Sequence, residues 1–156
     1  MADIMDAVEV STSLGGTCFR RVDGTVACFG GEAALASGAT ALTEHPSPED
    51  VPGLTDVVAL ESASFGVGTC AIRGAERSVV CWGTDFPAWG LGTSPGLGAA
   101  IYALDPPTGV TDIAVGLSHV CVVVDGRVRC LGGNSYGQLG DGRTEPSPTF
   151  VDVVLP

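Results

Sequence analysis

The sequence contains no lysine, and its seven basic residues are all arginine. Its 18 acidic residues give a formal net charge of −11. Such a chain repels phosphate backbones and anionic lipid surfaces, so nucleic-acid binding and membrane-surface binding are disfavoured. No apolar run approaches the roughly 18 residues of a membrane span. The stretch 1–6 carries acids where a signal peptide carries basic residues, so we expect no signal peptide in this chain.

Motifs for chemistry are also scarce. The sequence has no Walker loop, calcium loop or dinucleotide fingerprint, so we expect no cofactor and no metal. The stretch 92–96 matches Gly-x-Ser-x-Gly around Ser94, but no helix follows it and Pro95 lacks the N–H that an oxyanion needs, so it is interpreted as a turn. His45, in a predicted loop over 43–48, and His119 are assigned structural or solvated roles. No catalytic residue is assigned, and the chain is predicted not to be an enzyme.

Glycine and proline are abundant, with 23 and 10 of 156 residues, yet 45% of the residues are apolar. This apolar content disfavours a disordered chain, so the glycines and prolines are expected in turns. The length suits a single domain with a real core.

The six cysteines form three pairs at a regular spacing. The first members of the pairs are 52 and 51 residues apart, and each pair is preceded by a β-branched block about ten residues upstream. These blocks, at 6–10, 55–60 and 111–115, are typical of strands. Three copies of one unit therefore fill the chain. The pairs are Cys18 with Cys28, Cys70 with Cys81, and Cys121 with Cys130.

Each cysteine pair flanks a predicted hairpin turn. The two-residue turn 125–126, Asp-Gly, sets Cys121 opposite Cys130. A three-residue loop over 22–24 and a four-residue loop over 74–77 give the other two hairpins the same cysteine register. Counted outward from the turns, the cysteines fall at non-hydrogen-bonded sites, where Cα atoms approach to about 4.5 Å.

Three interpretations of the cysteines remain open. The favoured one is three cross-strand disulfides, each contributing about 2–3 kcal/mol. Buried free thiols in a cytosolic sheet are the second, because free cysteine is among the most buried residue types. Zinc is the third, although the spacing lacks the short knuckle and the histidines of a structural site. Disulfides would indicate an extracellular, periplasmic or cell-surface location, with the cytoplasm still open.

The third unit carries the most informative text. It reads Cys-Leu-Gly-Gly-Asn-Ser-Tyr-Gly-Gln-Leu-Gly-Asp-Gly over 130–142 and Pro-Ser-Pro over 146–148. With 116–121 and 81–83, this text resembles the regulator of chromosome condensation repeat. The resemblance covers nearly the whole chain, although the first two units lack the Asn-x-x-Gly-Gln-Leu-Gly loop. The doubled cysteines are similar to the versions found in bacterial exported or surface proteins.

The resemblance implies an all-β fold in which each repeat is one four-stranded antiparallel β-propeller blade. We expect a single repeat domain over 1–156, with blades at approximately 6–54, 55–110 and 111–156. Family rings commonly hold seven blades, so three blades make a partial or self-assembling propeller with open faces to cover. Two copies, a second chain or the rest of a longer protein would close the ring. The strands 8–10 and 149–154 are expected as seam partners, within or between chains.

The predicted function is a non-enzymatic protein-interaction or scaffold module. Its partner is another protein or a second copy in a homo-oligomer. The exchange and chromatin activities of family members do not transfer, because they rely on loops without a counterpart here. The alternative is a ligand-binding or hydrolytic domain that uses the 83–107 loop.

The same loop supplies the candidate partner-binding residues. Aromatic residues on loops are favoured binding anchors. The competing interpretation is that Trp89 and Leu91 fill the core positions that Tyr136 and Leu139 are expected to fill in the third unit. The candidates are Phe86, Trp89, Tyr102 and Leu104.

Overall fold

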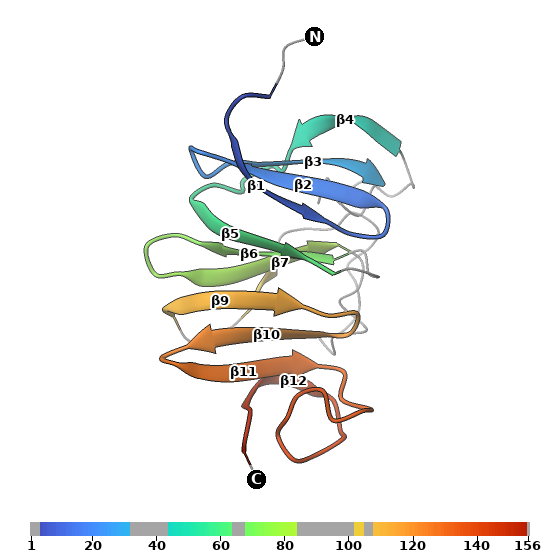
Figure 1. The fold of residues 1–156 in the computed structure, drawn as a ribbon, viewed down its shortest axis with the longest axis vertical. Helices are drawn as coiled ribbons and strands as arrows, with labels where there is room; N and C mark the ends of the chain where they lie inside the picture. Colours follow the sequence, from blue (N-terminus) through green and yellow to red (C-terminus); the bar gives the residue numbers. More distant parts are fainter. Residues whose placement is uncertain (1–3, 32–43, 64–67, 84–101, 105–107, 156) are drawn as a thin grey trace.

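The computed structural model describes residues 4–31, 44–63, 68–83, 102–104 and 108–155. Within these ranges the chain forms twelve β-strands in three four-stranded antiparallel sheets. Figure 1 shows the sheets following one another along the longest dimension, with the two termini at opposite ends. The predicted all-β class with three antiparallel blades is confirmed. The described part of the chain holds no helix that could cross a membrane.

Each sheet is a meander in which strands consecutive in sequence pair with one another. The inner strands β1, β5 and β9 neighbour one another from blade to blade. β9 begins at residue 110, one residue before the expected blade boundary. The first blade comprises β1 (Ala7–Thr12), β2 (Gly16–Arg21), β3 (Val26–Gly31) and β4 (Glu44–Asp50); the second comprises β5 (Val57–Ser62), β6 (Gly68–Arg73), β7 (Ser78–Gly83) and β8 (Tyr102–Ala103); the third comprises β9 (Val110–Val115), β10 (His119–Val124), β11 (Arg127–Gly132) and β12 (Ser147–Asp152).

The three hairpins have the register that their turns predict. Asp125 and Gly126 have φ of 50° and 71°, as a tight two-residue turn requires, and Cys121 lies opposite Cys130. The longer turns give the same cysteine register in the other two blades. The paired Cα atoms are 4.0, 4.0 and 4.1 Å apart, slightly closer than expected, and a disulfide joins each pair.

The blades stack through apolar faces of opposite kind. We call the face that carries a blade's disulfide its forward face, and the opposite face its rear face. One core cluster joins the forward face of the first blade to the rear face of the second, where Trp82 is fully buried. A second cluster joins the forward face of the second blade to the rear face of the third. Every disulfide therefore faces the same way along the chain.

The outer strands are poor in backbone donors. β4 contains Pro46 and Pro48, β12 contains Pro148, and β8 has only two residues.

His45, predicted in a loop, lies within β4, where its Nδ1 is 3.0 Å from a carboxylate oxygen of Glu49. Pairing of 8–10 with 149–154 within the chain was a wrong prediction. β1 is the inner strand of the first blade and β12 the outer strand of the third, and the two lie in different sheets without pairing to each other; pairing between chains stays a prediction.

A compact loop follows β11. Of the two residues of this loop that were predicted to lie in the core, one prediction is confirmed and one is wrong. Leu139 is fully buried, as expected, whereas Tyr136 is 95% exposed. The buried Asn134 side chain fixes this loop, because its Oδ1 accepts a hydrogen bond from the Leu139 N–H and its Nδ2 donates to Asp141 and to the Arg143 carbonyl. The loop thus turns Leu139 inward and leaves Tyr136 on the surface.

Candidate interaction surfaces

The two internal seams share a pattern of backbone hydrogen bonds. At the first seam the Val57 N–H donates to the Gly24 carbonyl at 3.0 Å, and at the second the Val110 N–H donates to the Arg77 carbonyl at 3.3 Å. Each donor is the first residue of an inner strand, and each acceptor lies in the preceding blade's hairpin turn, four residues before that blade's second cysteine. The pattern therefore describes how one blade receives the next.

Side chains of the inner strand add a second set of bonds at the first seam. Oε1 of Glu9 accepts a hydrogen bond from the Leu60 N–H at 3.1 Å, and Oγ of Ser11 accepts one from the Ser62 N–H at 2.9 Å. Glu9 is itself held by Arg20, whose Nε lies 2.7 Å from Oε2. An inner-strand carboxylate can thus serve as an acceptor for the following blade.

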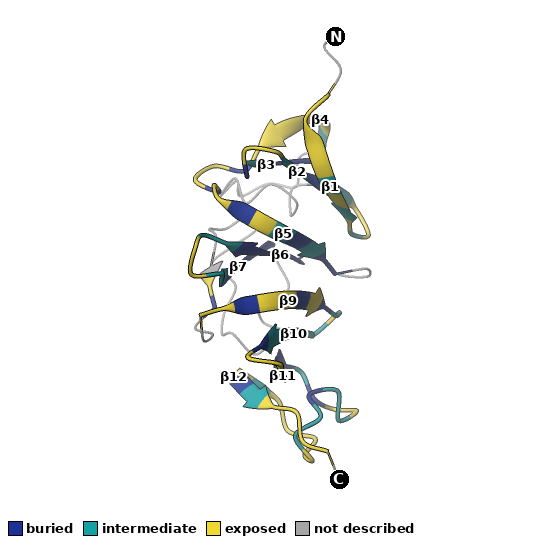
Figure 2. Cartoon of the chain, turned by 60° about the vertical axis from the view of Figure 1, so that its left-hand side comes forward, coloured by how far each residue is buried: buried dark blue, intermediate teal, exposed yellow. Residues whose placement is uncertain are grey.

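The forward face of the third blade is open. Counted from the cysteines, Val123 and Val128 correspond to Ile72 and Val79, which are fully buried at the second seam. Val128 is instead 43% exposed, and Cys121 and Val123 are only half-buried. Figure 2 shows this change from the buried middle blade to the exposed C-terminal end. Within the described part of the chain, the third blade thus carries a seam face that no further blade covers.

The rear face of the first blade is partly open at the other end, because Phe19 and Ala27 on it are buried but other positions are not. Val10 is 67% exposed, although Leu60 and Ile113, at the same position of the other blades, are buried. Phe29 is half-buried, whereas Trp82 and Leu131 at the equivalent position are buried. The chain therefore ends in two apolar faces of unlike kind.

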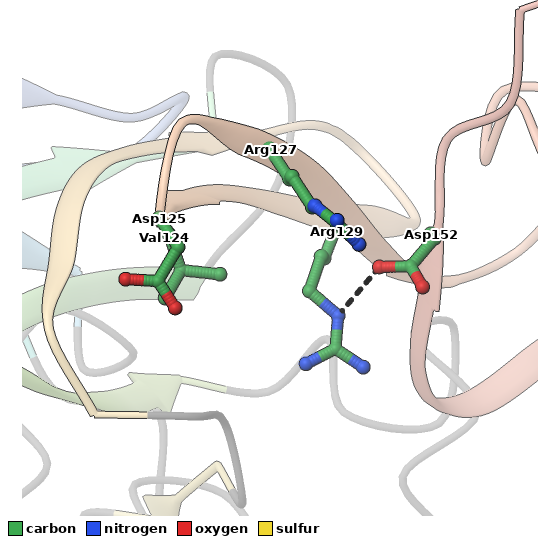
Figure 3. Close-up of a pocket in the computed structure, with 5 residues that line it drawn as sticks. All are labelled: Val124, Asp125, Arg127, Arg129 and Asp152. Carbon is green, nitrogen blue, oxygen red and sulfur yellow. Dashed lines mark ion pairs between the residues drawn. The ribbon is translucent and has the colours of Figure 1, made fainter.

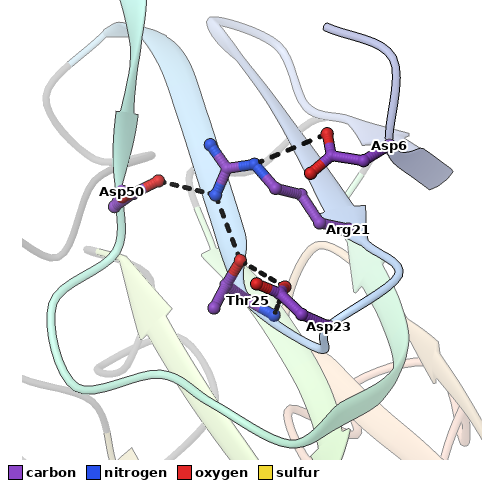
Figure 4. Close-up of polar contacts among 5 residues, drawn as sticks. All are labelled: Asp6, Arg21, Asp23, Thr25 and Asp50. Carbon is purple, nitrogen blue, oxygen red and sulfur yellow. Dashed lines mark hydrogen bonds and ion pairs between the residues drawn. The ribbon is translucent and has the colours of Figure 1, made fainter.

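Arg21 lies over the Phe19 ring on this rear face and also joins the polar network drawn in Figure 4. Its guanidinium carbon lies 5.3 Å from the centroid of the Phe19 ring, and Nη1 donates to Asp50 at 2.7 Å and to the Thr25 hydroxyl at 3.1 Å. The Thr25 hydroxyl and N–H both donate to Asp23, and these bonds lower the pKa of that carboxyl. The network ties the β2–β3 turn to β4.

A pocket of about 450 Å³ lies beside the hairpin turn of the third blade (Figure 3). Nε of Arg129 lies 3.0 Å from Oδ1 of Asp152, and Arg127 and Asp125 also line it. Two guanidinium groups face two carboxylates, so the pocket has balanced charge. Its lining groups suit polar contacts.

Acidic side chains gather along the inner strands. Glu61 on β5 is half-buried between Glu9 on β1 and Asp112 on β9. Burial raises the pKa of the Glu61 carboxyl, and the like charges of Asp112 and Glu9 raise it further. No group of three potential metal ligands occurs among the residues that the structure describes.

His119 has a packing role. A β-carbon on Gly116 would lie 2.3 Å from Cε1 of its ring, so the ring rests directly on the glycine backbone. Burial lowers the pKa of the imidazole, which favours the neutral form. This geometry suits a structural histidine.

The predicted partner-binding residues are not brought together as a described site. Phe86 and Trp89, together with Ser94, lie outside the described residues. Tyr102 lies in β8, where it pairs with Cys81. Leu104 is only 5% exposed because it packs in the core between the second and third blades, so assigning it to a partner surface was wrong.

Sequence reasoning named 8–10 as a seam strand but missed the exposure of individual residues on the open faces and in the loop after β11. The local sequence around three of these residues is typical of an ordinary strand or of the repeat loop; they are Val10, Val128 and Tyr136. A position-by-position alignment of the three units would have found the first two, because each aligns with a buried apolar residue of another blade. The exposed aromatic Tyr136 carries no such signal.

Comparisons with known proteins agree with this architecture. Residues 110–138 match the family model described as Regulator of chromosome condensation (RCC1) repeat. No curated protein sequence matches the chain closely enough to count as a relative.

Solved structures match almost the whole chain. The crystal structure of human WBSCR16 aligns with a TM-score of 0.74 and 24% identity, over 96% of this chain and 40% of that one. Yeast RCC1 (Prp20), bound to Kap60, aligns with a TM-score of 0.75 and 17% identity, over 97% and 38%. Prp20p from Saccharomyces cerevisiae gives 0.75 and 16%, over 97% and 40%.

The chain thus spans about 40% of the length of the structures it matches. At these identities the structural similarity establishes only the fold. The family-model match adds that the sequence of residues 110–138 is similar to the RCC1 repeat. The predicted resemblance is confirmed: residues 110–138 match the RCC1 repeat model, and the chain has the fold of three consecutive blades of an RCC1-type β-propeller.

Proposed function

We propose that this chain is a non-enzymatic protein-interaction or scaffold module, whose two open blade faces are covered by a protein partner. The observation that carries the proposal is the exposure of Val10 and Val128 at positions that are buried between blades elsewhere in the chain. Contiguous exposed apolar surface on a folded domain commonly marks an interaction site.

The partner is a protein rather than a nucleic acid. A net charge of −11 without lysine opposes a phosphate backbone. The published description of the Prp20p structure names binding to Gsp1p and histones, which supports protein recognition by this fold. Because the present chain covers about 40% of that protein, its own partner is assigned only by the chemistry of the open faces.

The absence of a catalytic role is part of the proposal. Its support is the pocket of Figure 3, where Arg129 is paired with Asp152 and no activated nucleophile is in reach. The competing hydrolytic function depends on Ser94 in the 83–107 loop. A screen with generic ester and glycoside substrates separates the two, since turnover that is lost in S94A would favour the hydrolase.

An extracellular, periplasmic or cell-surface location also belongs to the proposal. The three disulfides support it, because disulfides persist in oxidising compartments. Intact mass of protein from its native source, alkylated before and after reduction, tests it. Six alkylated thiols before reduction would refute an oxidising compartment.

Dye binding tests the interaction proposal directly. A dye that fluoresces on apolar surface should bind the native chain at high dilution, where no partner covers the open faces, and the V10D and V128D variants should bind clearly less under the same conditions. V58D is a matched control, because Val58 is 42% exposed but lies in the middle blade. Equal dye fluorescence for all four proteins would contradict an open apolar face at either end.

A further inference from the structure

The two internal seams define what a forward face accepts. In both, apolar forward positions pack against the inner strand and apolar rear positions of the next blade. In both, the first N–H of the incoming inner strand bonds to the carbonyl at the end of a hairpin turn. A forward face in this chain therefore receives a blade's rear face.

The third blade keeps every part of such a face. Val123 and Val128 stand where Ile72 and Val79 are buried, and Val153 stands where Leu104 is buried. The turn carbonyl is that of Gly126, which corresponds to Gly24. A β-carbon on Gly24 would lie 3.1 Å from β5 backbone atoms of the next blade, whereas one on Gly126 would meet nothing within 4 Å.

The first blade supplies the matching rear face. Val10 corresponds to Leu60 and Ile113, and Phe29 to Trp82 and Leu131, all four of which are buried in seams. Arginine at the Arg21 position is compatible with a closed seam, because Arg73 occupies it in the second blade. The chain thus carries both halves of one seam at its opposite ends.

Equivalent atoms identify the polar contacts of the missing seam. Ala7 corresponds to Val57 and Val110, so its N–H is the donor for the Gly126 carbonyl. Asp112 corresponds to Glu9 in register, so its carboxylate is the acceptor for the Val10 N–H, as Glu9 is for Leu60. Both pairs join the third blade to a first blade.

We infer that the forward face of the third blade binds the rear face of the first blade of a second copy of this chain. The inference rests on the proposed interaction function and names its partner. The contact is head-to-tail, so two copies make two identical seams and a closed ring of six blades. The apolar centre is Val123, Val128 and Val153 against Val10 and Phe29, with Asp112 and Gly126 as acceptors.

Sedimentation and native mass spectrometry of the intact, oxidised chain test the inference. The wild-type chain should shift from monomer to dimer as its concentration rises, without larger species. V10D and V128D should each weaken dimerisation by about tenfold or more, because each places a charge in both seams. V58D should dimerise like wild type, since Val58 has the same exposure as Val128 but belongs to neither face.

Mixing the two variants tests the head-to-tail arrangement. In a mixture of V10D and V128D, one of the two seams contains only wild-type residues, so a mixed dimer should form where each variant alone stays monomeric. This result also shows that both variants are folded. Normal dimerisation of V10D, with loss only in V128D, would mean that two forward faces meet, and it would overturn the inference.

A wild-type chain that remains monomeric at all concentrations would also overturn it. The proposed interaction function fails separately, through the dye experiment. If the chain binds dye but stays monomeric, its faces are open but a second copy is not the partner. The partner would then be a different protein that contains propeller blades.

Discussion

The side chain of Asn134 accepts a hydrogen bond from the backbone N–H of Leu139 at 2.9 Å, and neither side chain is exposed to solvent. The same amide donates to Oδ1 of Asp141 at 3.2 Å and to the Arg143 carbonyl at 3.1 Å. One buried side chain therefore satisfies three partners in a loop that has no regular backbone pairing. This makes the amide the structural centre of the RCC1-type loop.

We expect N134A to lower the free energy of unfolding by about 1–3 kcal/mol, because it leaves the Leu139 N–H buried without its acceptor. N134D keeps the acceptor but places a second carboxylate beside Asp141, so it should also be destabilising. Urea unfolding of the oxidised chain measures both changes. S135A, at a neighbouring exposed position, is the control, and losses below about 0.5 kcal/mol in N134A and N134D would contradict the role of the amide.

Alanine substitutions at two glycines with positive φ distinguish the cost of a steric clash from the cost of backbone strain. Gly132 has φ of 114°, and a β-carbon there would lie 2.3 Å from the Ser118 carbonyl oxygen. Gly142 has φ of 79° and open space around it. We expect G142A to cost about 1–2 kcal/mol from the left-handed backbone alone. G132A should cost clearly more in the same unfolding experiment, and equal losses would contradict the close approach.

The burial of His119 predicts a pH dependence of stability. Because its folded pKa is lowered from 6.5, the unfolded chain binds more protons as the pH falls through that range. The free energy of unfolding should therefore decrease below about pH 6.5, and this slope should flatten in H119Q. Unfolding at a series of pH values measures it. H45Q is the control and should keep the wild-type slope from His119.

Glu61 predicts a pH dependence of stability with the opposite sign to that of His119. Its folded pKa is raised, so the native state binds the proton more tightly than the unfolded chain, and Glu61 destabilises the fold above its unfolded pKa of 4.5. E61Q should be more stable than wild type at neutral pH, and the difference should vanish as the pH falls below 4.5. In D112N the gain from E61Q should be smaller, because one of the repelling charges is gone.

The disulfides should differ in their access to a reductant. Cys121 is half-buried on the open forward face, whereas both other disulfides are sealed between blades. Limited reduction of the dilute native chain, followed by alkylation and peptide mass spectrometry, should label Cys121 and Cys130 first. Covering the forward face should slow this labelling. Simultaneous labelling of all six cysteines would show that reduction follows global unfolding instead.

Much of the fold could be predicted from the sequence, because the decisive signals are local. The Asp125-Gly126 turn fixes its register by backbone geometry alone, and the observed pairing of Cys121 with Cys130 follows from it. The strand assignments rest on β-branched blocks with a fixed distance to the cysteines. Such features do not depend on contacts with distant parts of the chain.

The candidate site could not be predicted in the same way. Whether Val128 is core or surface depends on whether another blade follows, and Val79 at the equivalent position shows the other outcome. Leu104 was assigned to a surface because its stretch is rich in glycine and contains proline, yet it packs into the seam ahead of β9. Whether a residue on a blade face is exposed depends on whether another blade packs against that face, and the local sequence does not specify this.

The prolines of the outer strands have a consequence for how such chains accumulate. Pro46, Pro48 and Pro148 lack the N–H groups that a further strand would need, and β8 offers only two residues to pair with. The outer edges of the three sheets therefore lack a continuous row of donors for a strand from another copy, which is one route by which exposed β-edges produce fibrils. Cross-β growth in a concentrated solution of this chain should not start from these outer edges.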